Sequence, residues 1–354
     1  MRKFLLLVLA GAIVIGLYTY VTPKLSQHGT IPWLQDIRLA ISTNENPYTN
    51  NLSSVEQTIL NVTSNKCKRE LLLKGELFNL SKTDILTDLP LDVLNSHDFL
   101  PVKKGGFYEP ENCEPLTRTV IIIPYRNREK HLKIIINNLH RILQRQQLKY
   151  GIFVIELSLP TTFNIGVLMN MGFLLANNIS EYDCFVFHDV DLIPLDDRIA
   201  YHCDVSPKHM SAFNTKYAKV NIAKALPYSA YVGGVISLRG VDYKKLNGFS
   251  NAYFGWGGTD DDIEIRAKAA MIPFKRENQN IGRYYALPHQ RDSNNTENLF
   301  KGSLLKSSRK RYLNEGLNTV EKCCKRVSIV YRDLYVHVTV SCDENIVMNQ
   351  LLNL

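Results

Sequence analysis

Two carboxylates stand just after a short apolar run. Residues 184–187 are continuously hydrophobic and predict a buried strand of a parallel sheet. Asp189 and Asp191 follow, and Pro194 predicts that regular structure stops there. Ligands of open α/β sheets bind beyond the carboxyl ends of the strands, and Asp-x-Asp at that point suits a divalent cation that holds the phosphates of a nucleotide. An ordinary strand exit with two solvated acids is the alternative.

A second chemically dense stretch covers residues 251–266. The glycines around Trp256 predict a mobile loop with one large aromatic side chain. Thr259 is the expected N-cap of a helix, which places three successive acids, Asp260, Asp261 and Asp262, in the first turn, where the helix dipole favours carboxylates. Their crowding should raise at least one pKa, which suits hydroxyl binding and proton abstraction. A capped acidic helix start without chemistry is the simpler interpretation of the triplet alone.

Strands and helices alternate around the first of these stretches. Apolar spacing predicts strands over residues 119–123, 152–157 and 184–187, and helices over residues 129–146 and 164–176. This order is typical of a doubly wound, nucleotide-binding sheet. Another buried strand is expected after the glycine pair at residues 233 and 234.

Three further side chains gain a role from this arrangement. Arg126 and Arg128 follow the first strand, so we expect them at the same sheet edge as the Asp-x-Asp pair, where arginine can bind a phosphate. A surface arginine pair is the alternative. His289 by itself is more often a loop or core histidine, but as a partner of Asp191 it would complete a manganese site.

The composition limits the class of protein. The chain has 354 residues, of which 45% are hydrophobic and 21% charged, as in a globular protein of one large or two ordinary domains. Its formal charge of +8 would suit nucleic acid, an anionic membrane or phosphorylated ligands. No long basic block with interleaved aromatics occurs, so we expect no nucleic-acid partner. We interpret the basic cluster Lys306, Arg309, Lys310 and Arg311 as a solvated face.

The amino-terminal residues predict a membrane anchor. Arg2 and Lys3 precede an uncharged run over residues 4–21, about the minimum for a spanning helix, and the two cations favour a cytosolic amino terminus. A cleaved signal peptide is the alternative. We expect a cytoplasmic tail (1–3), a signal anchor (4–21), a polar lumenal stem (22–66) and a catalytic domain (67–354). N-glycosylation sequons and seven cysteines agree with an oxidising secretory compartment.

Several motifs, in this order, resemble those of the animal β-1,4-galactosyltransferase family. They are Pro124-Tyr-Arg-Asn-Arg128, Phe163-Asn164, Phe187-His-Asp-Val-Asp-Leu192, Tyr231-Val-Gly-Gly234, Asn247-Gly-Phe249, Gly255-Trp-Gly-Gly-Thr-Asp-Asp-Asp262 and His289. The resemblance runs from about residue 67 to about residue 340. It implies a GT-A fold with a Rossmann-like nucleotide-binding half, carried by a single-pass type II protein of the Golgi membrane with a lumenal catalytic domain.

The resemblance also implies an activity and a role for each matching residue. The reaction is inverting, Mn²⁺-dependent transfer of galactose from UDP-galactose to the 4-hydroxyl of a terminal N-acetylglucosamine on glycoproteins or glycolipids. Asp260 matches the general base, and Asp191 and His289 match the metal ligands. Donor-binding positions are Pro124, Tyr125, Arg126, Arg128, Phe163, Asp189, Val190, Tyr231 and Trp256. Acceptor-binding positions are Tyr228, Gly258, Asp260, Asp261 and Phe300.

The cysteines divide into two groups. The resemblance implies two disulfides, Cys67 with Cys113 and Cys184 with Cys203. Cys323, Cys324 and Cys342 match no family cysteine that we can place. For these three we expect one pair and one free thiol, with an intermolecular bridge as the alternative.

Three positions depart from the family pattern. Ala286 replaces a metal-ligating methionine, Ile165 replaces a phosphate-facing arginine, and Thr259 replaces an acid before the Asp triplet. These losses favour a non-catalytic sugar-nucleotide-binding paralogue as one alternative. A related transferase that uses N-acetylgalactosamine as donor or xylose as acceptor is another, although the large aromatic Tyr231 is associated with galactose.

Overall fold

The computed structural model describes residues 66–68, 72–77, 99–218, 225–290, 292 and 295–352. All of these residues belong to one compact unit, Asn65–Leu354. Within these ranges, no helix is both long and apolar enough to cross a membrane. The expected anchor over residues 4–21, and all but the last residue of the expected stem, lie outside the described residues.

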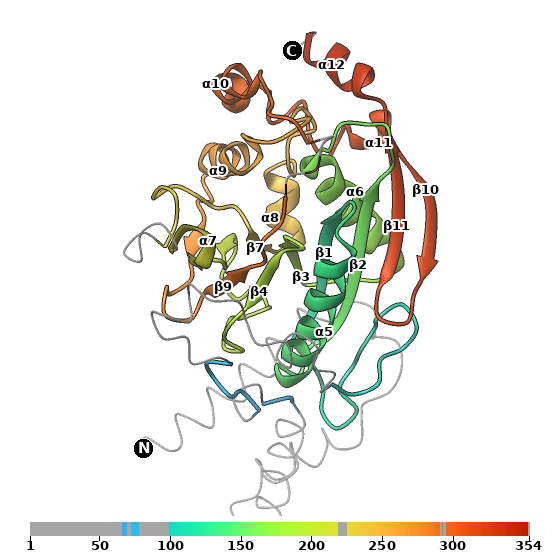
Figure 1. Ribbon diagram of the computed structural model, residues 1–354, viewed down its shortest axis with the longest axis vertical. Coiled ribbons are helices and arrows are strands. Elements are labelled where there is room, and N and C mark those ends of the chain that lie inside the picture. Colours follow the sequence, from blue (N-terminus) through green and yellow to red (C-terminus); the bar gives the residue numbers. More distant parts are fainter. Residues whose placement is uncertain are drawn as a thin grey trace, which may run out of the picture. The chain divides into compact units, whose positions relative to one another are not determined.

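A mixed sheet of eight strands forms the centre of the described fold (Figure 1), in the order β10-β11-β2-β1-β3-β7-β5-β8. The strands are β1 (Arg118–Tyr125), β2 (Lys149–Leu157), β3 (Cys184–His188), β5 (Lys208–His209), β7 (Val235–Leu238), β8 (Lys275–Arg276), β10 (Cys324–Tyr331) and β11 (Val336–Cys342). β1 pairs in parallel with β2 and β3, as expected of a doubly wound sheet, whereas β7 is antiparallel to β3.

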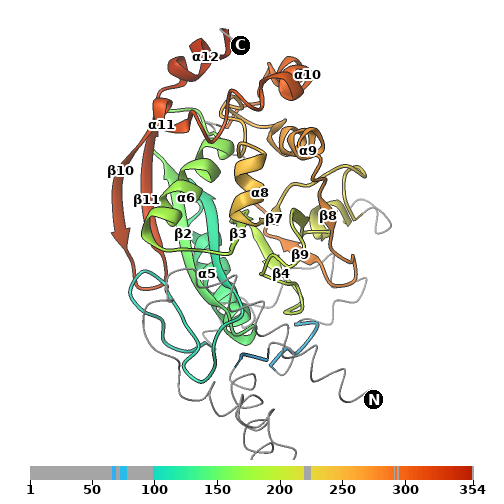
Figure 2. The same cartoon turned by 180° about the vertical axis from the view of Figure 1, so that it is seen from behind.

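Two helices cover opposite faces of the parallel strands. Ile121 and Ile123 of β1 belong to the core under α5 (Glu129–Arg145), while Val120 and Ile122 belong to the core under α6 (Ile165–Ile179). α5 lies over the sheet in Figure 1, and α6 lies over it in the view from behind (Figure 2). Because β1 is buried on both sides, it reads as an unbroken apolar run rather than an alternating one. All the strands and helices predicted in this half are confirmed, with shifted ends.

A smaller sheet and several short helices complete the described part of the chain. The sheet has the order β4-β9-β6, with β4 (Leu192–Pro194), β9 (Arg283–Ala286) and β6 (Phe213–Asn214). Regular structure stops at Pro194 as expected, because Pro194 is the last residue of β4, but the short strand itself, which pairs with β9, was not predicted. The further helices are α7 (Thr215–Ala218), α8 (Gly240–Lys245), α9 (Thr259–Ala269), α10 (Lys301–Arg311), α11 (Val320–Cys323) and α12 (Glu344–Leu352).

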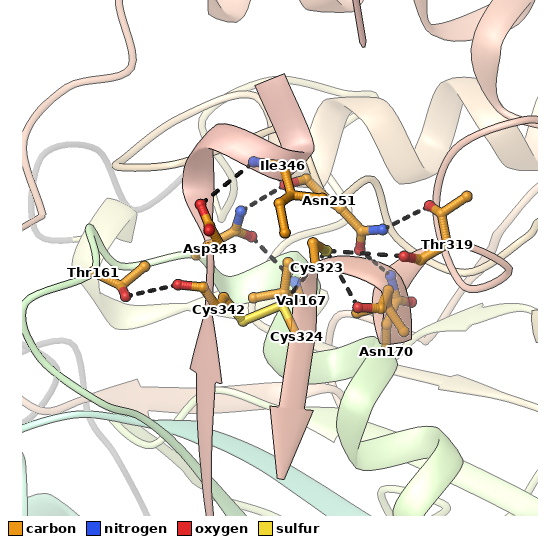
Figure 3. Close-up of a disulfide and its surroundings, with 12 residues drawn as sticks. Thr161, Val167, Asn170, Asn251, Thr319, Cys323, Cys324, Cys342, Asp343 and Ile346 are labelled. Atoms are coloured by element: carbon orange, nitrogen blue, oxygen red, sulfur yellow. Dashed lines mark hydrogen bonds between the residues drawn. A yellow bond between two sulfur atoms is a disulfide. The ribbon is translucent and has the colours of Figure 1, made fainter. Parts of the chain in front are cut away.

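All seven cysteines lie in the described residues, and six of them form three disulfides. Cys67–Cys113 and Cys184–Cys203 are the two pairs that the family resemblance implied. Cys324–Cys342 closes the base of the β10–β11 hairpin, where the two residues are also ladder partners (Figure 3). Cys323 is free and buried, with its Sγ 3.6 Å from that of Cys324. The expectation of one pair and one free thiol is therefore confirmed.

The pairing predicts a single alkylation site. Burial raises the pKa of the Cys323 thiol to about 11, so the native protein should react slowly at pH 7 because little thiolate is present. After denaturation without reductant, iodoacetamide should add one group to the chain, on Cys323. Peptide mass mapping checks the position, and an adduct on Cys324 or Cys342 instead would contradict this pairing.

Candidate active site

A cleft of about 720 Å³ opens at the carboxyl ends of β1 and β3. Most of the predicted site residues line it together: Pro124, Arg126, Arg128, Phe163, Asp189, Val190, Asp191, Tyr228, Tyr231, Trp256, Gly258, Asp260, Asp261 and His289. Two predicted residues are not in the lining. Tyr125 packs against the core under α5, and the ring of Phe300 is 62% exposed beside Lys301, which does line the cleft.

The predicted metal ligands meet at one edge of this cleft. His289 Nε2 lies 2.9 Å from Asp191 Oδ2, and Arg128 Nη2 lies 3.2 Å from His289 Nδ1. The hydrogen bond with Asp191 raises the pKa of His289. No third His, Cys, Asp or Glu in the described ranges joins these two as a metal-binding group. Strand β9, which ends at Ala286, lies beside Asp191. The backbone N–H of the next residue, Leu287, donates to the carbonyl of Asp191.

Negative charge is concentrated beside this pair. The pKa of Asp189 lies well above its usual value, because of burial first and then because of the nearby carboxylates of Asp191 and Asp260. A bound cation would relieve this repulsion. One carboxylate and one imidazole also suit manganese chemically. The residues present therefore fit a divalent cation, which Asp191 and His289 would hold.

Arg126 is fixed at the floor of the cleft by three contacts. Its Nη1 donates to the carbonyl of Thr161 at 2.8 Å, and its Nε lies 3.1 Å from Asp292 Oδ2. The guanidinium carbon stands 4.9 Å from the centre of the Phe163 ring. Thr161 in turn donates its hydroxyl to the carbonyl of Cys342 at 3.1 Å, which joins the loop after β2 to the third disulfide (Figure 3). Arg126 is thus rigidly placed in a concave, partly apolar site.

Two acids of α9, Asp260 and Asp261, also line the cleft. Tyr228 donates its hydroxyl to Asp261 Oδ1 at 2.6 Å. A Cβ placed on Gly233 would lie 2.3 Å from both Asp260 Oδ2 and the Tyr231 hydroxyl, so only glycine leaves room for the Asp260 carboxylate there. The pKa of Asp260 is raised to about 6, chiefly by burial and then by Asp261. A raised pKa in the triplet was predicted from crowding, but burial is the larger cause.

The start of α9 differs from the prediction in one respect. Thr259 is the first helical residue rather than the N-cap, and Gly258 takes the N-cap position at φ 92° without a side-chain cap. Gly255 and Gly257 also have positive φ, at 85° and 106°. Such angles strain other residues, which explains why the loop around Trp256 needs glycine. The indole is 48% exposed, and Lys301 Nζ lies 5.6 Å from its ring centre.

A buried network of four charges holds α9 in place. Arg266 contacts Asp262 at 2.5 Å and Glu315 at 2.6 Å. Arg311 contacts the same two acids, at 2.8 Å and 2.6 Å. All four side chains are at most 5% exposed. Arg311 had been assigned to a solvated face, which is wrong for this residue of the cluster.

The sequence matches two protein-family models. They are the N-terminal region of glycosyl transferase group 7, over residues 75–204, and the N-terminal domain of galactosyltransferase, over residues 213–290. Beta-1,4-galactosyltransferase 4 of Homo sapiens is 38% identical over 73% of this chain and 73% of that protein. Beta-1,4-galactosyltransferase 3 of Mus musculus is 41% identical over 62% of this chain and 54% of that protein. The chain belongs to the β-1,4-galactosyltransferase family.

A solved structure supports the same assignment. The catalytic domain of Drosophila beta1,4galactosyltransferase 7, in complex with xylobiose, is 26% identical, with a TM-score of 0.53 over 64% of this chain and 95% of that chain. A mutant of the fly enzyme was solved with manganese, UDP-Gal and xylobiose. The expected GT-A-like mixed α/β fold of the galactosyltransferase family is confirmed.

The cleft contains residues that the sequence motifs did not indicate. They include Lys216, Tyr217, Pro227, Asp292, Lys301 and Leu305. Lys216 and Tyr217 lie in a helix of four residues, too short for a periodic signal. Lys301 and Leu305 lie on α10, whose apolar positions are too few to predict which face meets the cleft. Ile165, which stands where the family pattern has a phosphate-facing arginine, lines the cleft with its apolar side chain.

The buried network predicts a large stability effect at Glu315. Replacing Glu315 with glutamine leaves two buried guanidinium groups with one carboxylate, and breaking such a pair costs about 3–5 kcal/mol. Urea unfolding should show the loss as a lower midpoint. Glu321→Gln, at an exposed site on α11, is the matched control and should stay within about 0.5 kcal/mol of wild type. Equal midpoints for the two variants would show that the network contributes little.

Proposed function

We propose that this chain transfers galactose from UDP-galactose to the 4-hydroxyl of a terminal N-acetylglucosamine on a glycoprotein or glycolipid, with inversion at the anomeric carbon and with manganese as cofactor. The observation that carries the proposal is the arrangement of the cleft. A carboxylate with a raised pKa, Asp260, lines the same cleft as the Asp191–His289 pair and the two arginines. Inverting transfer needs a base for the acceptor proton and positive charge at the departing diphosphate, on opposite sides of one sugar.

Asp260 is the base in this proposal. In a single displacement, the acceptor hydroxyl attacks the anomeric carbon as its bond to UDP breaks, and the hydroxyl proton passes to a carboxylate oxygen. A base works best when its pKa is close to the working pH, and a pKa of about 6 meets that condition better than an ordinary aspartate. Asp261 and Tyr228, already hydrogen-bonded to each other, are placed to hold the other hydroxyls of the acceptor.

Asp191 and His289 would hold the manganese, and Arg126 and Arg128 would face the nucleotide. When bound, the cation supplies positive charge that offsets the charge that grows on the diphosphate. His289 must be neutral to coordinate, whereas its hydrogen bond to Asp191 raises its pKa, so cation binding should weaken at acidic pH. The guanidinium of Arg126 lies over the Phe163 ring, where its positive charge would face the phosphates of the donor.

Tyr231 and Trp256 complete the donor side of the proposal. Burial and Asp260 raise the pKa of Tyr231 well above its usual value, so the phenol keeps its proton and can donate a hydrogen bond. A large ring at that position leaves less room for an N-acetyl group, which favours galactose over N-acetylgalactosamine. Trp256, on its glycine-rich loop, is positioned to cover the donor and exclude the water that would hydrolyse it.

We also propose that the chain is a single-pass type II protein of the Golgi membrane with its catalytic domain in the lumen. The support is the amino-terminal sequence, with cations at residues 2 and 3 before an uncharged run over residues 4–21. Three disulfides agree with an oxidising compartment.

Asp260→Asn tests the base directly. The amide cannot accept the proton, so transfer should fall by about 10²–10⁴-fold, while UDP binding measured by calorimetry stays close to wild type. With manganese saturating at every pH, the wild-type rate kcat/KM should fall as the pH drops below about 6, because protonation of Asp260 removes the base, and the residual rate of the variant should lack this limb. A variant that loses transfer and UDP binding equally would refute the role of Asp260 as the base.

Ala286→Met tests the two-ligand metal site. A thioether beside Asp191 and His289 would add a third protein ligand, so the variant should bind manganese about tenfold more tightly in the presence of UDP. Electron paramagnetic resonance of free Mn²⁺ measures this without any turnover. Leu287→Met is the control for a neighbouring methionine, since Leu287 belongs to a separate apolar cluster. Equal manganese affinity in both variants would show that position 286 does not face the ion.

A further inference from the structure

One turn forms the acceptor side of the cleft. It runs from Tyr228 to Tyr231 and is closed by a hydrogen bond of 3.2 Å from the backbone N–H of Tyr231 to the carbonyl of Tyr228. Tyr228 reaches Asp261 with its hydroxyl, and the Tyr231 hydroxyl lies by Gly233 beside the Asp260 carboxylate. Both ends of this turn therefore determine where a sugar can sit against the acids of α9.

Apart from Tyr231, little of the turn is covered by neighbouring side chains. Ser229 and Ala230 are exposed, and the ring of Tyr228 is 46% exposed. An exposed turn with few packing contacts samples several conformations unless its backbone groups are held. The position of Tyr228 should thus depend on how the backbone carbonyls of the turn are bound.

Arg276 binds two of these carbonyls from outside the cleft. Its Nη2 donates to the carbonyl of Ser229 and to that of Tyr231, both at 2.7 Å. The two hydrogens of this one nitrogen are thus used on two residues of the same turn. Arg276 lies on β8, at the edge of the central sheet, where its neighbour Lys275 pairs with Lys208 of β5. The turn is therefore tied to the sheet.

The charge of Arg276 strengthens these bonds. Partial burial lowers its pKa, and the carboxylate of Glu264, on α9, opposes that effect. The guanidinium stays charged at any physiological pH, and hydrogen bonds from a charged donor are about twice as strong as neutral ones. Because Glu264 is on the helix that carries Asp260 and Asp261, the guanidinium is attracted to the acid-bearing helix while it holds the turn.

We propose that Arg276 is a positioning residue for the acceptor: by holding the carbonyls of Ser229 and Tyr231, it keeps Tyr228 against Asp261 in the geometry that binds the acceptor sugar. The inference rests on the proposed function, since it takes this side of the cleft as the acceptor subsite. Arg276 is absent from the cleft lining, so it acts through the turn and not by touching substrate. The nucleotide side, with Arg126, Arg128 and the metal pair, does not depend on it.

Arg276→Met keeps much of the apolar stem and removes both hydrogen bonds. In the purified full-length chain, KM for N-acetylglucosamine should rise about tenfold, while kcat changes less than threefold and UDP affinity stays at the wild-type value. Arg276→Lys keeps the positive charge and three N–H donors but lacks the planar guanidinium. Its KM for N-acetylglucosamine should therefore lie between those of wild type and Arg276→Met. Lys275→Met removes the same charge one residue earlier, from a side chain on the opposite face of the strand, and should behave as wild type.

Three results would overturn the inference. An unchanged acceptor KM in Arg276→Met would show that the turn holds its position without Arg276. An equal loss of UDP binding or an equal fall in kcat would indicate a general structural role, and thermal unfolding of each variant identifies a simple loss of fold. A rise in KM for Lys275→Met as large as that for Arg276→Met would indicate a long-range charge effect.

Failure of the proposed transferase activity can be distinguished from failure of the inference about Arg276. If wild type transfers to no acceptor, the activity proposal fails, but calorimetric titration of N-acetylglucosamine onto the UDP-loaded protein still tests Arg276. The same tenfold difference between wild type and Arg276→Met in that titration would support positioning in a binding protein. Equal sugar affinities, or no sugar binding by wild type, would refute it.

Discussion

Two buried arginines and two buried acids hold together the half of the molecule that carries the acids of the cleft. Asp262 comes two residues after Asp260 in α9, and Arg311 and Glu315 lie at the end of α10 and just after it. Charges that leave water must be compensated, and here each guanidinium meets both carboxylates, so none is left alone. Any other placement of α9 against α10 would bury unpaired charges. The constraint therefore fixes the helix whose first turn carries the acids of the cleft.

The sheet side of the cleft depends on a different constraint. Three parallel strands, β2, β1 and β3, are buried on both faces and end at one edge, which places the residues after β1 and β3 together. Helices α5 and α6 cover this sheet from opposite sides (Figures 1 and 2). The cleft is thus lined by a sheet edge, by the first turn of a helix held by buried charges, and by the glycine-rich loop with Trp256.

The parallel half of the fold could be predicted from sequence because its signal is local. The apolar run over residues 119–123 predicts a strand, and the periodic pattern that begins at Glu129 predicts a helix. Their alternation predicts a parallel sheet whose strands end at one edge. The pairing of Asp191 with His289 was raised from ligand chemistry and implied by the family resemblance, but no local pattern indicates it, since 98 residues separate them. The strand at Pro194 was missed because its partner, Tyr284, is distant in sequence. Arg311 was misjudged because burial of a charge depends on partners that no local pattern reveals.

The central claim, that the cleft is a galactosyltransferase active site, is tested most directly by product analysis. The full-length chain would be purified and given UDP-galactose, manganese and N-acetylglucosamine, with xylose as the competing acceptor because the fly relative was solved with xylobiose. The linkage of the product would be read by NMR. The account predicts a galactose joined β-1,4 to N-acetylglucosamine and no comparable product on xylose. UDP binding with no transfer from any sugar nucleotide to either acceptor would contradict it and would indicate a protein that binds the nucleotide without catalysis.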